Sequence, residues 1–417
     1  MKKTLLVTLL VIATLYAGNA QSFCNNPLRF SETPIFTNSQ ITSQLNVVYG
    51  NAVTWQGQNQ ALTLNVCYPK FSEDTMALRP FILIIHGGGF VSGNKEDWND
   101  ECLEFAKRGF VAATIDYRLG LTPNCAVDSF SYDKAIYRAI QDARAALRFV
   151  VENAATSRID TSRMFIGGGS AGAATSLGVV YFSQPDWDSY SPTIPQTLGP
   201  LNTSGNNLTN TFSIKGVMNN WGGIGKEFIT PEEMVPMISF HGDADSTVNI
   251  DSALAKSCVD PALVYGSRPL YTLLTNSGVC SDLSIKVDGG HGVYNNAGNN
   301  YRVERTACFF KSVMCNTCTN FYSTDSIPAN CSGVLGINTP AANSAFSIYP
   351  NPSSGDFNLV FADNAKKTVT LINAMGQVVQ RFTVADKQAV VAPQVSGLYF
   401  ITVQDSDKVW SQKIIKQ

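Results

Sequence analysis

The stretch "FIGGGSAG" at residues 165–172 decides the fold, because it fits two patterns that imply different chemistry. Its glycines at 167, 169 and 172 spell G-x-G-x-x-G, the loop that cradles a dinucleotide pyrophosphate. Gly168, Ser170 and Gly172 spell G-x-S-x-G, the strained turn that presents a nucleophilic serine. Each pattern fixes only three positions, so the rest of the chain has to decide between them.

Short apolar runs alternate with helical patterns on both sides of this stretch. Between the second and third runs, apolar residues recur at helical spacing from Ile136 to Val150. Such runs, separated by helices, predict an α/β fold with a mainly parallel sheet covered by helices on both faces. Residues 61–69 alternate instead, and we expect them to pair antiparallel with residues around Val47 to Tyr49. The expected buried strands are "FILII" (81–85), "FVAATIDY" (110–117), "MFIGG" (164–168), "FSIKGVM" (212–218), "VPMISF" (235–240) and "LSIKVD" (283–288).

Composition and the N-terminus point to an exported protein. The 417 residues are 44% hydrophobic, with a formal net charge of -2, which leaves no electrostatic footprint for nucleic acid or an anionic membrane. Lys2 and Lys3 precede an apolar run from Leu5 to Tyr16, and Gly18 and Ala20 stand before a cut at Gln21. Residues 1–20 therefore read as a secretory signal peptide. The apolar run falls short of the roughly 20 residues that span a bilayer, and no other segment qualifies as transmembrane.

Ten cysteines agree with export, because an even count in an oxidising compartment predicts disulfides. The sequence leaves their pairing open. One alternative is a zinc site held by the thiolates of Cys308, Cys315, Cys318 and Cys331. That alternative is disfavoured, because the Cys-x-x-Cys pair is not repeated and the compartment oxidises thiols. We expect no metal.

The dinucleotide interpretation fails on its further requirements. The phosphate loop belongs in the first strand–helix unit, with an acidic residue about twenty positions on, at the end of the next strand. Asp186 has roughly that offset, but it stands in "SQPDWDSY", which does not read as a strand. An exported protein also lacks ready access to a nicotinamide cofactor. We expect no cofactor, and we interpret the stretch as a nucleophile turn.

The nucleophile turn needs amides that stabilise an oxyanion, and two segments supply them. Ala171 follows the serine at the start of an Ala-rich helix, where its amide points toward developing negative charge. The second donor is expected from "FILIIHGGGF", in which the triple glycine follows a strand directly. Glycine lets the backbone approach a substrate oxygen closely, so the amides of Gly88 and Gly89 are the candidates.

A general base and an acid complete the set. The chain has three histidines: His86 belongs to the glycine loop, His241 directly follows a strand, and His291 follows the last strand. A loop after the last strand can place His291 over the sheet, so we predict that it is the base. Asp243 and Asp245 both follow "VPMISF" closely, and Asp288 is a weaker rival. We favour Asp245, with Asp243 as a turn former.

Three aromatic residues are candidates for the substrate pocket. Phe90 follows the triple glycine, and Trp221 follows the strand after the serine. Trp187 lies in residues 183–211, a stretch rich in Pro, Ser, Thr and Asn that interrupts the alternation. Long excursions in compact domains are usually functional, so we expect a loop or lid there. Core packing is the alternative role for Phe90 and Trp221.

The C-terminal part reads as a separate unit. Residues 319–344 have a linker composition, and short alternating strands with Gly, Asn and Pro turns follow at 345–417, which predicts a small β-sandwich. "YPNPSSGDF", "LINAMGQVV", "SGLYFITV" and the terminal Lys-rich strand resemble the C-terminal sorting domain of the Bacteroidetes type IX secretion system. The resemblance implies that this machinery is a partner. It also implies that the protein is secreted or attached to the outer cell surface.

Residues 60–315, within a predicted catalytic domain at 21–318, resemble the α/β-hydrolase fold. "HGGGF" and "GGSAG" are similar to the motifs of secreted carboxylesterases and lipases. The His-Gly-Asp-Ala-Asp segment resembles that of feruloyl-esterase and dienelactone-hydrolase-like proteins, which implies that its second aspartate, Asp245, is the triad acid. One departure is Gly169, where lipase- and cholinesterase-type members usually carry an acidic residue.

The expected function is hydrolysis of carboxylic esters, through an acyl-enzyme on Ser170. The resemblance implies short-acyl substrates or feruloyl and acetyl esters on polysaccharide. A serine peptidase of the prolyl-oligopeptidase type is one alternative, but it usually brings a propeller, and no blade-length repeat occurs here. A non-catalytic binding protein on a hydrolase scaffold is the other, although such proteins usually lose triad members.

Overall fold

The computed structural model describes residues 23–121, 128, 131–230, 233–254, 263–295, 300–325, 331, 346–351, 353–361, 363–373, 377–405 and 409–417. The chain divides into two compact units, Met1–Leu335 and Gly336–Gln417. The predicted signal peptide at 1–20 lies outside the described residues. So does most of the predicted linker at 319–344.

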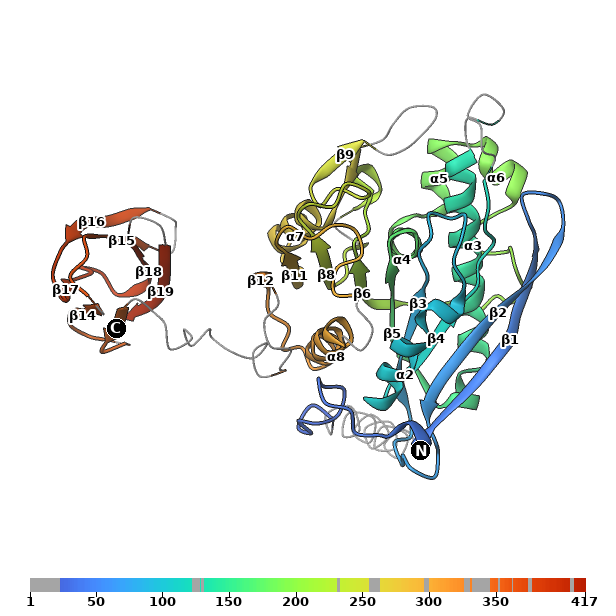
Figure 1. Cartoon of the computed structure of the whole chain (residues 1–417), viewed down its shortest axis with the longest axis horizontal. Helices are drawn as coiled ribbons and strands as arrows, with labels where there is room; N and C mark the ends of the chain where they lie inside the picture. Colours follow the sequence, from blue (N-terminus) through green and yellow to red (C-terminus); the bar gives the residue numbers. More distant parts are fainter. Residues whose placement is uncertain are drawn as a thin grey trace, which may run out of the picture. The chain divides into compact units, whose positions relative to one another are not determined.

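A nine-stranded sheet forms the centre of the first unit, in the order β1-β2-β4-β3-β5-β6-β8-β11-β12 (Figure 1). The three strands at one edge pair antiparallel, and all pairs from β4 onward are parallel. The expected antiparallel partner of residues 61–69 is present, since Val47 pairs with Leu64. The strands are β1 (Ile41–Val53), β2 (Asn59–Pro69), β3 (Arg79–Ile85), β4 (Val111–Ile115), β5 (Ile159–Gly169), β6 (Ile214–Asn220), β8 (Met237–Gly242), β11 (Ser281–Lys286) and β12 (Phe321–Thr324).

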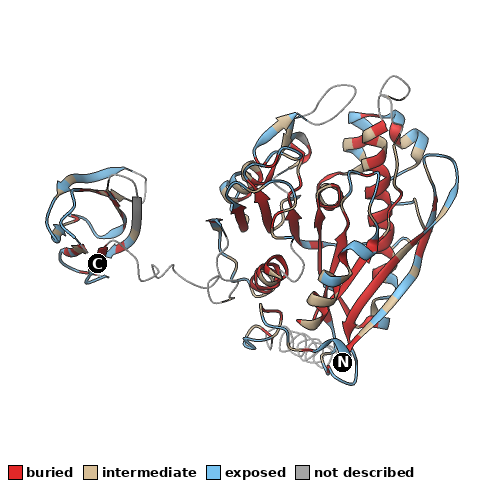
Figure 2. Cartoon of the chain, viewed as in Figure 1, coloured by how far each residue is buried: buried red, intermediate tan, exposed pale blue. Residues whose placement is uncertain are grey.

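Helices cover both faces of this sheet, and the side chains of β3 show how. Successive residues of a strand point to opposite faces. Leu83 accordingly packs with the helices α3, α4 and α7, whereas Ile82 and Ile84 pack with α2 and α8. The inner strands β3, β4, β6 and β8 are buried almost throughout (Figure 2). The helices are α2 (Asn99–Lys107), α3 (Ser131–Glu152), α4 (Ala171–Tyr181), α7 (Ser267–Asn276) and α8 (Tyr301–Met314). The predicted α/β fold is confirmed.

Shorter elements complete the first unit. A small antiparallel sheet has the order β7-β10-β9. Four short 3-10 helices lie in the described connections. Their bounds are β7 (Ile224–Gly225), β9 (Ser252–Leu254), β10 (Leu263–Tyr265), η1 (Asn38–Gln40), η2 (Lys95–Trp98), η3 (Ala154–Ser157) and η4 (Lys226–Phe228).

The structure differs from the sequence prediction at β12. Residues 321–324 were expected in the linker, but they pair in parallel with β11 and form the last strand of the sheet. The disulfide between Cys280 and Cys318 joins the segments that enter these two strands. A strand of only four residues, Phe321–Thr324, is too short to show a strand pattern beside the Asn, Thr and Ser residues around it, which explains the difference.

Hydrogen bonds hold the excursion at 183–211 against helix α3. It contains α5 (Gln184–Tyr190) and α6 (Thr193–Leu198). Side chains spaced along α3 then hold the segment that follows: the Tyr137 hydroxyl donates to the Gly199 carbonyl, and the Gln141 amide to the Leu198 carbonyl. Backbone carbonyls of the excursion therefore accept hydrogen bonds from side chains of α3.

The second unit is a β-sandwich, as predicted. Its sheets have the orders β13-β14-β17 and β16-β15-β18-β19, and every strand pair within them is antiparallel. Phe357, Leu371 and Ile401 belong to one buried core between them. The strands are β13 (Phe346–Tyr349), β14 (Phe357–Phe361), β15 (Lys367–Asn373), β16 (Val378–Val384), β17 (Gln388–Val391), β18 (Gly397–Gln404) and β19 (Val409–Lys416).

Three disulfides join cysteines of the first unit that the structure describes: Cys24–Cys315, Cys280–Cys318 and Cys308–Cys331. They use all four cysteines of the zinc alternative in three different bonds, which leaves no thiolates for that site. The expectation that every cysteine is paired is wrong for Cys67 and Cys102, which are free and buried. The Cys102 thiol donates to the Ala112 carbonyl at 3.1 Å instead. Cys125 and Cys258 lie outside the described residues.

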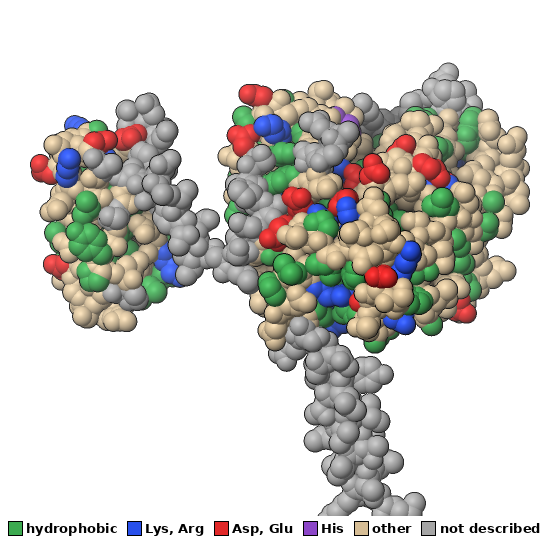
Figure 3. Space-filling view, turned by 60° about the horizontal axis from the view of Figure 1, so that its bottom comes forward, with side chains coloured by type: hydrophobic (Ala, Val, Ile, Leu, Met, Phe, Trp, Pro, Cys, Tyr) green, Lys and Arg blue, Asp and Glu red, His purple; other side chains and the backbone are tan. Residues whose placement is uncertain are grey.

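Two observations on the described residues concern membrane-spanning helices and surface charge. Within the described ranges, no helix combines the length and the apolar character needed to cross a bilayer. On the face shown in Figure 3, acidic and basic side chains are interspersed with hydrophobic ones.

The buried ion pair between Arg118 and Asp142 ties the loop after β4 to α3, and its removal should be costly. Asp142 accepts from the Arg118 backbone amide at 2.8 Å and from its guanidinium at 2.7 Å, and both side chains are buried. Asp142→Asn leaves the guanidinium buried without its counter-charge. We expect a loss of about 3–5 kcal/mol in the free energy of unfolding, measured by urea denaturation.

Asp251→Asn is the matched control, because its partner Arg268 and the carboxylate itself are exposed. Exposed pairs contribute at most about 1 kcal/mol. Equal losses in the two variants would contradict this account of Asp142.

Candidate active site

Ser170 stands in a strained turn between β5 and α4. Its backbone has φ 55° and ψ -118°, a region that residues with a side chain rarely adopt. Its amide donates to the Asn220 carbonyl of β6 at 2.9 Å, which holds the turn against the sheet. At Gly172, a Cβ would lie 2.0 Å from the Ile85 carbonyl oxygen, so only glycine lets α4 begin this close to β3. The predicted strand–turn–helix is present.

A continuous path of hydrogen bonds leads from Ser170 to Asp245. The Ser170 Oγ lies 2.8 Å from the His291 Nε2, and the His291 Nδ1 lies 2.8 Å from the Asp245 Oδ2. A carboxylate can only accept, so Nδ1 carries the proton and Nε2 accepts from the serine hydroxyl. The structure thus brings together the three residues that the sequence selected, from loops after β5, β8 and β11.

Asp245 is buried and held in its ionised form. Its Oδ1 accepts from the amides of Thr247 at 2.8 Å and Val248 at 3.0 Å. Burial raises the pKa of the Asp245 carboxyl, but hydrogen bonds from His241, His291 and these two amides outweigh burial and hold the pKa well below its usual range. Asp243, the rival acid, is exposed.

His241 is a partner of Asp245 that the sequence analysis did not identify. Its Nε2 lies 2.9 Å from the Val248 carbonyl oxygen and 3.3 Å from the Asp245 Oδ2. Both are acceptors, so Nε2 carries a proton and Nδ1 accepts from the Ser267 hydroxyl at 2.7 Å. Asn219 donates in turn to Ser267 at 3.2 Å. A fully buried polar chain therefore stands behind the carboxylate.

The glycine loop lies directly against the serine turn. A Cβ at Gly87 would come within 2.8 Å of the Gly169 carbonyl oxygen and 3.4 Å of the Ser170 Cβ. Gly88 and Gly89 have φ of 101° and 62° and are exposed. Among the described residues, no hydrogen bond uses the amides of Gly88, Gly89 or Ala171. These amides are free to donate hydrogen bonds to a substrate oxygen.

His86 and Tyr117 pack against each other and hold the backbone of the glycine loop. Their rings stack at 4.3 Å, and the Tyr117 hydroxyl lies 3.1 Å from the His86 carbonyl oxygen and 3.3 Å from that of Gly87. The His86 Nδ1 lies 2.8 Å from the same Gly87 oxygen. Burial lowers the pKa of His86, which favours a neutral ring here. Neither residue was assigned this role from the sequence.

Two tryptophans explain why glycine precedes the nucleophile. A Cβ at Gly169 would lie 2.7 Å from the Trp98 ring and 3.1 Å from the Trp221 ring. Arg302 lies over both rings, 5.0 Å from that of Trp98 and 5.1 Å from that of Trp221. The space that an acidic side chain would need is therefore filled by a cation–π stack.

The predicted pocket aromatics lie in different surroundings. Trp221 packs edge-on against His291, with 6.2 Å between ring centroids. Phe90 is 1% exposed and packs against Tyr117 and Tyr132. Trp187 is 2% exposed, in an aromatic cluster with Tyr137, Phe182 and Tyr190. In the described part of the chain, only Trp221 of the three contacts the Ser170–His291–Asp245 set.

The depressed pKa of Asp245 makes a testable contribution to stability. Since the folded pKa lies below the unfolded value of about 3.9, the carboxylate stabilises the fold above about pH 4 and loses this contribution as pH falls through the folded pKa. We expect the difference in unfolding free energy between the wild type and Asp245→Asn to shrink below pH 4, by up to about 1.4 kcal/mol per pH unit. Urea denaturation between pH 5 and pH 3 measures it.

Asp243→Asn is the control for this series, because that carboxylate is exposed only two positions away. Its difference from the wild type should stay within about 0.5 kcal/mol. A difference for Asp245→Asn that stays constant or grows as pH falls would contradict the assignment.

Two family models match the chain. The model described as BD-FAE matches residues 64–224, and the model described as secretion system C-terminal sorting domain matches residues 347–417. The first match contains the glycine loop and the Ser170 turn. The second coincides with the β-sandwich unit.

Curated relatives match over short stretches. Neuroligin-like protein glit-1 of Caenorhabditis elegans is 34% identical over 114 residues, 27% of this chain and 15% of that protein. Gut esterase 1 of the same organism is 34% identical over 138 residues, 32% of this chain and 23% of that protein. Esterase LipI of Mycobacterium tuberculosis is 32% identical over 108 residues, 26% of this chain and 30% of that protein. The chain therefore spans less than a third of the length of these relatives.

Solved esterase structures are similar at low identity. Thermogutta terrifontis esterase 2, phosphorylated by paraoxon, is 20% identical with a TM-score of 0.42, over 64% of this chain and 90% of that chain. Esterase B from Lactobacillus rhamnosis is 15% identical with a TM-score of 0.44, over 76% of this chain and 97% of that chain. The two family models locate the similarity more sharply: residues 64–224 are similar to BD-FAE, an α/β-hydrolase esterase family, and residues 347–417 are similar to the secretion system C-terminal sorting domain.

Proposed function

We propose that the first unit is a carboxylic-ester hydrolase that works through an acyl-enzyme on Ser170. The observation that carries the proposal is the hydrogen-bonded path from the Ser170 Oγ through His291 to the buried Asp245. Open amides of the glycine loop lie beside this path. A nucleophile, a base, an orienting acid and an oxyanion site are the parts that acyl transfer needs.

In the first step, His291 takes the proton of the Ser170 hydroxyl through Nε2 while Oγ attacks the ester carbonyl. The carboxylate of Asp245 holds the ring and stabilises the imidazolium that forms. The amides of Gly88, Gly89 and Ala171 receive the negative oxygen, each worth about 2.7–4 kcal/mol of barrier by analogy with a donor removed from another hydrolase. His291 then protonates the leaving alcohol. In the second step, His291 activates water, which attacks the acyl-enzyme and frees the acid.

His241 has a supporting role in this proposal. Its Nε2–H points at the Asp245 oxygen that also faces His291. A second donor on that oxygen favours the ionised carboxylate and fixes its plane. His241 therefore acts through Asp245 and does not touch the reacting atoms.

The substrate class follows from the resemblance and from export. The sorting domain indicates secretion and attachment at the outer surface, and it implies the type IX machinery as a partner. We propose short-acyl esters, or feruloyl and acetyl esters on polysaccharide, as substrates. Trp221 lies beside His291, and we propose that it contacts the leaving alcohol or the attacking water there. Phe90 and Trp187 are weaker proposals for the pocket, since both are buried in the core.

Ser170→Ala tests the proposed nucleophile. We expect the wild type to release p-nitrophenol from acetyl and butyryl esters, and to release acetate or ferulate from substituted xylan. The variant should lose about 10⁴-fold or more in kcat, because no other hydroxyl can form the acyl-enzyme. Ser213→Ala, an exposed serine outside the site, is the control and should retain activity.

No hydrolysis of any ester by the wild type would favour the binding-protein alternative. Cleavage of peptides alone would favour a peptidase. Equal activity of Ser170→Ala and the wild type would overturn the nucleophile assignment.

A matched pair of glycine variants tests the oxyanion loop. At Gly88, φ is 101° and a Cβ would lie 2.0 Å from the Ser92 carbonyl oxygen, so Gly88→Ala has to displace the loop. At Gly89, nothing lies within 4 Å of a Cβ, so Gly89→Ala costs only the strain of a positive φ. We expect kcat to fall about 10²-fold or more in Gly88→Ala and less than tenfold in Gly89→Ala, measured on p-nitrophenyl acetate.

Thermal unfolding midpoints of both variants control for global damage. Equal losses of kcat in the two variants, at similar midpoints, would contradict the loop geometry.

A further inference from the structure

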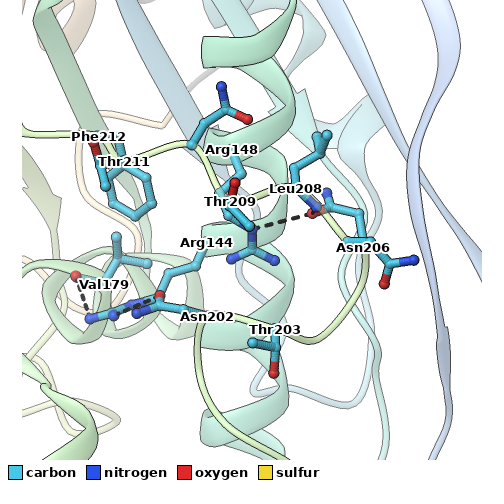
Figure 4. A pocket seen from close by; sticks show the side chains of 12 residues that line it. Arg144, Arg148, Val179, Asn202, Thr203, Asn206, Leu208, Thr209, Thr211 and Phe212 are labelled. Carbon is cyan, nitrogen blue, oxygen red and sulfur yellow. Dashed lines mark hydrogen bonds between the residues drawn. The ribbon is translucent and has the colours of Figure 1, made fainter.

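A second cavity lies away from Ser170, between helix α3 and the loop that follows α6 (Figure 4). Its volume is about 660 Å³, and its walls are formed by Arg144 and Arg148 of α3, Val179 of α4, and residues 202–203 and 206–212. Val179 lies nine positions after Ser170, which corresponds to about 13 Å along the helix axis. The cavity is therefore separate from the proposed active site.

The two arginines of this cavity are buried without a carboxylate partner. Arg144 is 9% exposed and Arg148 is 2% exposed. All their hydrogen bonds go to neutral oxygens: the carbonyls of residues 179 and 182 and the Asn202 side chain for Arg144, and the Ser204 carbonyl and Asn206 side chain for Arg148. Several other buried arginines of this unit face an acid, as in the pairs Arg79–Asp74, Arg118–Asp142 and Arg302–Glu101.

Two donor groups in the cavity also have no partner. Within the described chain, the Arg144 Nε and the Arg148 Nη1 are buried and make no hydrogen bond. A buried donor without an acceptor is destabilising, and more so when it is charged. Burial, followed by the charge of Arg148, lowers the pKa of Arg144 to about 10, and burial lowers the pKa of Arg148. The site therefore carries positive charge that no ion pair of the described residues neutralises, and the more distant Glu233 offsets it only in part.

The remaining walls suit a polyhydroxylated ligand. Four asparagines and three threonines between residues 202 and 211 offer amide and hydroxyl groups, and Leu208 and Phe212 offer apolar surface. Glu152 accepts from the Asn210 amide at 3.0 Å. Glu233 acts on Arg144 at longer range, without an ion pair. Guanidinium groups match the geometry of carboxylate and phosphate oxygens.

We propose that this cavity binds an oxyanion carried by a sugar, with a sugar carboxylate as the ligand. The guanidinium groups of Arg144 and Arg148, which line the cavity, hold the anion, and the asparagine and threonine side chains bind the hydroxyl groups. The site goes beyond the proposed hydrolysis of esters and does not depend on it, because it shares no residue with the Ser170–His291–Asp245 set.

Calorimetric titration of the full chain tests the proposal, at constant ionic strength and with three probes. Sodium glucuronate should bind saturably at one site and raise the thermal midpoint with concentration. Glucose, which lacks the anion, should bind at least tenfold more weakly. Inorganic phosphate distinguishes the source of the recognition: competition with glucuronate shows that the oxyanion dominates, and no competition shows that the sugar hydroxyls are also required.

Arg148→Met removes one guanidinium and keeps the apolar stem, so glucuronate should bind at least tenfold more weakly. Thr209→Asp is the second variant, in case the first fails to fold. Thr209 is exposed and lines the same cavity. The carboxylate that this substitution introduces would repel the ligand, while both arginines stay in place. Arg268→Met, an exposed arginine outside the cavity, is the matched control and should bind glucuronate like the wild type.

Failure of glucuronate to bind the wild type would overturn the proposal. So would unchanged binding in Thr209→Asp, or equal binding of glucuronate and glucose. In those cases the two arginines would serve only to brace α3 against the loop.

Discussion

The close approach of β3, β5 and α4 at Ser170 is the constraint on which the rest of the first unit depends. A residue at φ 55° is unfavourable by itself, so its surroundings have to impose it. The bond from the Ser170 amide to the Asn220 carbonyl fixes one side of the turn. The contact of Gly172 with Ile85 fixes the other. The same contacts bring the glycine loop, which leaves β3, to the serine, which leaves β5.

The environment of Asp245 shows a second constraint, the cost of burying a charge. A buried carboxylate is tolerated only when donors surround it. Here two backbone amides and two histidines do so, and the second histidine is itself fixed by Ser267. The arrangement explains why an acid in this loop stays ionised next to the sheet, and why the neighbouring Asp243 does not take its place.

Local patterns predicted much of this architecture, because they are set by contacts within one segment. The apolar runs predicted the parallel strands, and the glycines around Ser170 predicted the strand–turn–helix. His291 was selected by elimination among three histidines, and the structure places it against Ser170. The roles of these residues, and of Asp245, stay predictions until activity is measured.

Other features depend on contacts between distant segments, which the sequence does not display. His241 meets Asp245 only because the loop after β8 folds back over the strand end. Arg302 of α8 reaches Trp98, which precedes α2, only because these two helices cover the same face of the sheet. The polar excursion at 183–211 suggested a lid, since its composition does not reveal that α3 supplies its hydrogen bonds.

The bond between Cys24 and Cys315 has a consequence for how the protein matures. These cysteines are 291 positions apart, so the link closes a loop that contains nearly the whole first unit. In the chain-entropy model such a link lowers the entropy of the unfolded ensemble by an amount worth about 6 kcal/mol at 25 °C. A polypeptide that crosses a membrane N-terminus first has to keep Cys24 unpaired until α8 has emerged and docked. Formation of the Cys24–Cys315 disulfide therefore marks the docking of α8.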